Sequence, residues 1–167
     1  MKWTEGHIHV VMRDVLRQKG WTLVAGEFPG GSDHELYPLN VVDPVVARDA
    51  SPDPRRHSLG ELIPDLVALR GANLFVGEAK VSYNEGDRRK LEILLSQRRA
   101  HFISALRNFG KERGFPELLS PEKLIVHPVL IFRVDSKAPP PPDGFSYLRV
   151  ISQREAFFEG PLSKDQE

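Results

Sequence analysis

The feature that most constrains this chain is a pair of apolar segments, residues 63–70 and 73–81, separated by a two-residue turn that begins with Gly71. Glycine at the first central position tolerates the positive φ of a type II′ turn, so the two segments are predicted to form an antiparallel β-hairpin. A four-residue loop with Leu69 opposite Leu74 gives the same register. Both faces of the hairpin carry apolar residues, which predicts a central strand pair covered on both sides.

Three charged residues interrupt this apolar hairpin. Asp65 is expected directly opposite Glu78 for either turn, and Lys80 is expected on the same face because side-chain direction repeats every second residue of a strand. Two adjacent carboxylates in a covered sheet repel each other and are costly to remove from water, and a divalent cation relieves both effects. Their oxygen atoms suit Mg²⁺ or Mn²⁺, and Lys80 can hold an attacking water or stabilise charge on a phosphate, as phosphodiester hydrolysis requires. The structural alternative is that Lys80 bridges the two acids in a buried ion pair.

The pattern of Pro64-Asp65, twelve residues and then Glu78-Ala79-Lys80 resembles the motif of the PD-(D/E)XK nuclease superfamily. Members of this superfamily share the restriction-endonuclease-like fold. The resemblance extends over about residues 4–134 at the level of architecture. It implies an α/β protein with an αβββαβ core, in which a mixed central sheet is flanked by helices.

The same resemblance implies roles for individual residues. Asp65, Glu78 and the backbone carbonyl of Ala79 would be ligands of Mg²⁺ or Mn²⁺, and Lys80 would position or activate the nucleophilic water. Many members add a glutamate from the first helix, and Glu5 is the candidate here because it shares a helix face with the apolar residues that point to the core. The alternative role for Glu5 is that of a first-turn acid favoured by the helix dipole.

The remaining elements are predicted from periodicity, caps and turn residues. In chain order they are a helix over 4–20, a strand over 21–28, a long excursion over 29–58 with a short strand inside it, a helix over 85–110, strands over 123–134 and 145–151, and a short C-terminal helix with a frayed tail. The length of 167 residues predicts one domain over 1–167, which the resemblance implies is nuclease-like, with an insertion loop at about 29–58 and a C-terminal strand and tail at about 145–167.

The segment from Lys80 to Arg113 carries nine Lys or Arg and four Asp or Glu, although the net charge of the whole chain is zero. This local surplus predicts a surface for the phosphate backbone of a nucleic acid, and a solvated helix face is the alternative. The candidate nucleic-acid-binding residues are Arg88, Arg89, Lys90, Arg98 and Arg99. Arg98 falls in the apolar stripe of the predicted helix, where it either reaches the metal site or extends its charged end to solvent.

Several classes of function are disfavoured by composition. The chain has no cysteine, which excludes disulfides and thiolate zinc sites, and no apolar run long enough for a membrane span or signal peptide, so a cytoplasmic protein with no membrane partner is expected. His7 and His9 are two residues apart, which places them on different faces of a helix. All six histidines are therefore assigned structural or surface roles.

Together these features predict a Mg²⁺-dependent endonuclease that hydrolyses phosphodiester bonds in DNA, in restriction, repair or mobile-element biology. A non-catalytic DNA-binding or assembly module of the same fold is the first alternative. An RNase or structure-specific nuclease is the second. A homodimer is compatible with double-strand cleavage, which needs two sites, but no sequence feature indicates one.

Overall fold

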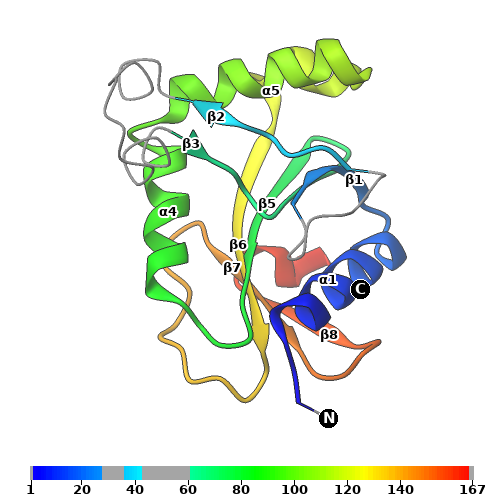
Figure 1. The fold of residues 1–167 in the computed structure, drawn as a ribbon, viewed down its shortest axis with the longest axis vertical. Coiled ribbons are helices and arrows are strands. Elements are labelled where there is room, and N and C mark those ends of the chain that lie inside the picture. Colours follow the sequence, from blue (N-terminus) through cyan, green and yellow to red (C-terminus); the bar gives the residue numbers. More distant parts are fainter. Residues whose placement is uncertain (1, 28–35, 43–60, 166–167) are drawn as a thin grey trace, which may run out of the picture.

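The computed structural model describes residues 2–27, 36–42 and 61–165 (Figure 1). Its centre is a six-stranded sheet, and a short second sheet pairs β2 (Val41–Val42) with β3 (Glu61–Leu62). The spatial order of the main sheet is β1 (Thr22–Gly26), β4 (Leu66–Arg70), β5 (Asn73–Ala79), β6 (Ile125–Arg133), β7 (Ser146–Val150) and β8 (Ala156–Glu159). Within the described residues, no helix is both long and apolar enough to cross a membrane.

The strand directions make this a mixed sheet. β1, β4 and β5 are antiparallel neighbours, β5, β6 and β7 run parallel to one another, and β8 is antiparallel to β7. The parallel step from β5 to β6 is made through two helices, α4 (Glu85–Leu95) and α5 (Arg99–Arg113). The predicted α/β class with a mixed central sheet is therefore confirmed.

The hairpin of β4 and β5 has the predicted register. Leu69 pairs with Leu74 and Leu66 with Gly77. Gly71 has a φ of 59°, whereas no residue other than glycine has a positive φ in the described part of the chain. A positive φ at only the first central position is the signature of a type II′ turn, so the turn chemistry also follows the sequence.

Helices cover both faces of the hairpin, as its two apolar faces predicted. Helix α1 (Glu5–Gln18) packs through Ile8, Met12 and Leu16 against one face, and α4 and α5 cover the other face (Figure 1). The residues of β4 alternate accordingly, with Leu66 and Ala68 toward α1 and Val67 and Leu69 toward α4 and α5.

Local signals in the sequence explain where α1 begins and ends. The Thr4 side chain caps the helix by accepting a hydrogen bond from the His7 amide, while the Thr4 amide donates to Nδ1 of His7. Gly20, with a φ of 86°, follows the last turn, and the amides of Gly20 and Trp21 donate to the carbonyls of Arg17 and Leu16. This Schellman arrangement stops the helix and directs the chain into β1.

Two predictions for the second half of the chain were wrong. The single helix expected over 85–110 is two helices, because the chain turns at residues 96–98. Arg98 is the N-cap residue of α5 and does not lie in the apolar stripe of a continuous helix. After β7 the chain forms β8, a strand that was not expected, and the short C-terminal helix that was expected is a 3₁₀ helix, Pro161–Asp165.

Most of the predicted insertion over 29–58 falls outside the described residues, which include 36–42 of it. The expectation of a short strand within it is confirmed by β2, which pairs with β3 near the start of the central hairpin. Leu39 and Val41 are buried in the same core cluster as Phe102 and Leu106 of α5. The described part of the long excursion is therefore anchored on the face of the sheet that α4 and α5 cover.

The packing of α5 against the following 3₁₀ turn, Pro116–Leu119, gives a test of this core. A β-carbon on Gly110 would meet Cβ of Leu118 at 2.7 Å and the carbonyl oxygen of Phe115 at 2.9 Å. We expect Gly110→Ala to lower the free energy of unfolding by about 1–3 kcal/mol, even though alanine is normally the better helix former. Urea denaturation of the two proteins measures this difference.

Ser104, which is exposed on the same helix, provides the matched control. The Ser104→Ala protein should be more stable than the Ser104→Gly protein by about 0.5–1 kcal/mol, because only helix propensity distinguishes the two substitutions. An increase in stability for Gly110→Ala would show that the chain after α5 does not pack as described.

Candidate metal centre

The candidate site lies where four elements meet at the carboxyl end of β5. This is also the edge of the sheet at which β4 begins, and α1 and α4 begin there. In open α/β sheets, the carboxyl ends of parallel strands are the usual location of ligand sites. The fold therefore brings polar residues from separate parts of the sequence to one edge.

Asp65 occupies the position just before β4. Its Oδ2 accepts a hydrogen bond from the Ala79 amide at 2.9 Å, and its backbone carbonyl accepts one from the Glu27 amide at 3.0 Å. The side chain is 16% exposed, and Nε2 of His9 lies 3.6 Å from Oδ2. Asp65 is thus fixed between β1 and β5, with its carboxylate turned toward α1 and open to solvent on one side.

Glu78 is the buried acid of the site, and its carboxyl group lies near Asp65 and contacts Lys90 of α4. The single face expected for Asp65, Glu78 and Lys80 is therefore met only in part, because Asp65 and Lys80 lie against His9 and Glu5 of α1. Glu78 is 3% exposed, and its Oε1 lies 2.6 Å from Nζ of Lys90, which also donates to the Ile63 carbonyl at 2.7 Å. Burial and the nearby Asp65 carboxylate raise the pKa of Glu78 to about 9, and the opposing effect of Lys90 does not offset them. Without a metal, Glu78 therefore holds a proton at neutral pH.

Lys80 follows β5 and binds Glu5, which is neither of the two acids, Asp65 and Glu78, that the structural alternative named. Its Nζ donates to Oε1 of Glu5 at 2.9 Å, and both side chains are about two-fifths exposed, at 40% and 38%. This hydrogen bond is the main cause of a raised pKa for Lys80. The alternative in which Lys80 bridges Asp65 and Glu78 is not what the structure shows, because Lys80 contacts Glu5 and Lys90 is the lysine in contact with Glu78.

Glu5, His9 and Asp65 form a group that could hold a metal ion. Each offers one ligand atom, and these atoms all lie within 4.8 Å of one another. Burial lowers the pKa of His9, which is 1% exposed, so its imidazole is neutral and suited to metal binding. Glu5, proposed from the sequence, is brought to the site. His9, for which only a structural or surface role was expected, lies beside it.

Asp87, in the first turn of α4, is a second residue that sequence reasoning did not find. Its Oδ2 is buried and makes no hydrogen bond within the described chain. Burial is the main cause of its raised pKa, and Lys80, Asp65 and Lys90 are near enough to act on it. The sequence signals were the spacings Glu5-x-x-x-His9 and Asp87-x-x-Lys90, because residues four or three apart share a helix face.

The five candidate nucleic-acid-binding residues lie in different surroundings. Arg88 is held by Glu85 and Glu92, and Lys90 points inward to Glu78. Arg89 is 71% exposed on α4. Arg98 and Arg99 lie at the junction of α4 and α5, where Arg99 is exposed. A role in binding nucleic acid remains a prediction for all five.

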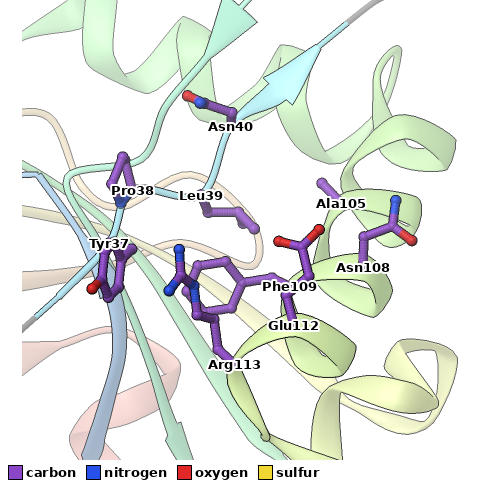
Figure 2. A pocket seen from close by; sticks show the side chains of 9 residues that line it. All are labelled: Tyr37, Pro38, Leu39, Asn40, Ala105, Asn108, Phe109, Glu112 and Arg113. Atoms are coloured by element: carbon purple, nitrogen blue, oxygen red, sulfur yellow. The ribbon is translucent and has the colours of Figure 1, made fainter.

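A separate cleft of about 370 Å³ lies between residues 37–40 and α5 (Figure 2). The Arg113 guanidinium stacks on the Tyr37 ring, 3.5 Å from the centre of the ring. Leu39 and Phe109 form the apolar wall of the cleft. The acids of the sheet edge do not line this cleft; they are Glu5, Asp65, Glu78 and Asp87. The chemistry of the candidate site is therefore not located at this hollow.

Comparison with known proteins adds no family assignment. No protein-family model, curated protein sequence or solved structure matches the chain.

The proton on Glu78 gives a test of the site's electrostatics in the absence of metal. Between pH 4.5, its ordinary value, and about pH 9, the folded protein retains a proton that the unfolded chain has released. The contribution of Glu78 to stability therefore falls as the pH rises through this window, by at most about 1.4 kcal/mol per pH unit. Relative to wild type, Glu78→Gln should gain stability with rising pH, as measured by urea denaturation in EDTA.

Glu112→Gln is the matched control, because Glu112 is exposed on α5. Its stability should follow the wild-type pH dependence throughout. If the free energy of unfolding varied with pH in the same way for Glu78→Gln and wild type, Glu78 would be ionised in the folded protein. Burial and Asp65 would then not raise its pKa.

Proposed function

We propose that this protein is a divalent-metal-dependent nuclease that hydrolyses phosphodiester bonds in DNA. The observation that carries the proposal is the convergence of Glu5, Asp65, Glu78 and Lys80 at one sheet edge. Glu5 comes from α1, whereas the other three come from the end of the β4–β5 hairpin, which is distant in sequence. The group combines oxygen ligands for a hard cation with a lysine that is partly exposed to solvent.

The order of the elements supports the same proposal. Helix α1 is followed by the antiparallel strands β1, β4 and β5, then by two helices and the parallel strand β6. With the short β2–β3 pair between β1 and β4 set aside, this order is compatible with the αβββαβ core that the resemblance to the PD-(D/E)XK superfamily implies. Asp65 immediately precedes β4, Glu78 and Ala79 end β5 and Lys80 follows β5, so both parts of the motif lie at the same end of two adjacent strands, which is compatible with that resemblance.

The residues at the edge fit a divalent cation. Glu78 is buried next to a second carboxylate, and its negative charge would be stabilised by a cation in place of a proton. Asp65 and Glu78, with the Ala79 carbonyl, would hold Mg²⁺ or Mn²⁺, and Glu5 and His9 approach from α1. A cation bound there would polarise the phosphate and acidify a bound water.

Lys80 would act on the water or on the phosphate oxygens. Its ammonium group is already oriented by Glu5 and lies at the open side of the site. From there it can hold the attacking water, or stabilise the charge that develops on the phosphate. Lys90 is committed to Glu78, which leaves Lys80 as the lysine available for chemistry.

A cleavage assay tests the proposal directly. Supercoiled, linear and single-stranded DNA, and RNA, are incubated with the protein in Mg²⁺, Mn²⁺ or EDTA. Lys80→Ala should lower cleavage by about 10²-fold or more, because it removes one electrostatic or proton-handling group. Its free energy of unfolding should change by less than about 1 kcal/mol, because the Lys80–Glu5 pair is exposed.

Lys164→Ala, at an exposed lysine near the C-terminus, controls for charge removal and should cleave normally. Wild-type cleavage by Lys80→Ala would remove Lys80 from the mechanism. Metal-dependent binding of DNA without cleavage by the wild-type protein would favour the non-catalytic module, and cleavage restricted to RNA would favour a ribonuclease.

Binding of DNA is expected to use the exposed arginines of α4 and α5. Arg89→Ala combined with Arg99→Ala should weaken binding and lower the slope of log K against log salt by about 1.8, if each residue contacts one phosphate of duplex DNA. The cleavage rate at saturating DNA should be retained. Fluorescence anisotropy at several salt concentrations measures the slope, in EDTA to prevent cleavage.

The control for this experiment removes the same charge elsewhere, with Lys123→Ala and Lys164→Ala, both exposed in the structure. That pair should leave the slope unchanged. Equal loss of binding in the two double variants would show that net charge, and not the α4–α5 surface, attracts DNA.

A further inference from the structure

The buried imidazole of His9 is the feature of the site that a purely oxygen-ligated magnesium centre does not require. We infer that His9 is a direct metal ligand together with Glu5 and Asp65, and that it makes the site select Mn²⁺ over Mg²⁺. The inference rests on the proposed metal-dependent function and specifies which cation that function uses.

The first step of the argument is distance. Nε2 of His9 lies 3.6 Å from Oδ2 of Asp65, and the ligand atoms of Glu5, His9 and Asp65 all lie within 4.8 Å of one another. Atoms bound to one cation at about 2.1 Å are separated by about 3.0 Å when adjacent and about 4.2 Å when opposite. Small side-chain movements would therefore bring all three groups to one ion.

The second step is rigidity. Glu5 and His9 lie one turn apart on α1, so their side chains are on the same helix face. The neighbouring residues Ile8 and Met12 are fully buried against the sheet, and His9 itself is 1% exposed. The imidazole is consequently held beside Asp65 by the packing of the helix, at a fixed place relative to β4.

The third step is the chemistry of the ligands. Mg²⁺ requires near-ideal oxygen coordination and keeps several waters, whereas imidazole nitrogen suits first-row transition metals. A set of two carboxylates and one imidazole is a mixed O/N site of the kind that Mn²⁺ accepts. His9 thus gives the site a preference that Asp65 and Glu78 alone would not give.

The alternative is that His9 acts through Asp65, orienting its carboxylate without touching the metal. Pulsed electron paramagnetic resonance of bound Mn²⁺ separates the two, because a coordinated imidazole nitrogen gives a ¹⁴N modulation that a more distant ring does not. We expect this modulation in the wild-type protein, and its loss in His9→Gln. In isothermal titration, His9→Gln should weaken Mn²⁺ binding by at least about 10-fold and Mg²⁺ binding by much less.

Two controls keep the test decisive. His7→Gln changes a histidine two residues away that caps the helix through Thr4, and it should leave the ¹⁴N modulation in place. If His9→Gln fails to fold, wild-type protein with ¹⁵N-labelled histidine answers the same question, because the modulation must change to the ¹⁵N pattern.

The outcomes distinguish this inference from the proposed function. Bound Mn²⁺ with no histidine nitrogen coupling, or equal loss of Mg²⁺ and Mn²⁺ affinity in His9→Gln, overturns the inference and leaves a metal-dependent nuclease intact. Nitrogen coupling in a protein that cleaves no nucleic acid supports the inference and overturns the nuclease. Failure of both cations to bind overturns both.

Discussion

The structure depends on burying the β4–β5 hairpin on both faces while two carboxylates remain at its end. The apolar faces require α1 on one side and α4 with α5 on the other, and this cover removes Glu78 from water. Asp65 stays at the margin, next to Glu78. Burying a carboxyl group next to a second one costs free energy. Without a metal, a proton on Glu78 and the contact with Lys90 reduce this cost, and a bound cation could replace either.

The two lysines of the site divide two tasks between them. Lys90 reaches in from α4 to the buried Glu78, where its removal would leave the buried carboxyl group without its polar partner. Lys80 lies at the open edge, bound to the half-exposed Glu5. Exposed pairs contribute little to stability, whereas groups beside buried acids contribute much more. This separation leaves Lys80 able to change partners without loss of the fold, as the proposed reaction would require.

Helix α1 links the stability of the fold to the geometry of the candidate metal site. Its apolar face packs on the sheet, and the next positions along the same helix carry Glu5 and His9 to the sheet edge. Capping by Thr4 and termination at Gly20 set the ends of the helix. The position of these candidate metal ligands is therefore determined by core packing, which is more rigid than a loop would be.

The sequence by itself determined the hairpin, its register and turn, the ends of α1 and the proximity of Asp65 to Glu78, because period-two alternation, glycine at the turn and helix caps are local. Only the tertiary structure decided which acid each lysine binds, that His9 and Asp87 approach the acids, and that the chain turns at Arg98 between α4 and α5. These depend on how α1 and α4 lie across the sheet. The spacing of residues along one chain places side chains on a helix face but does not specify which residue of another element that face meets.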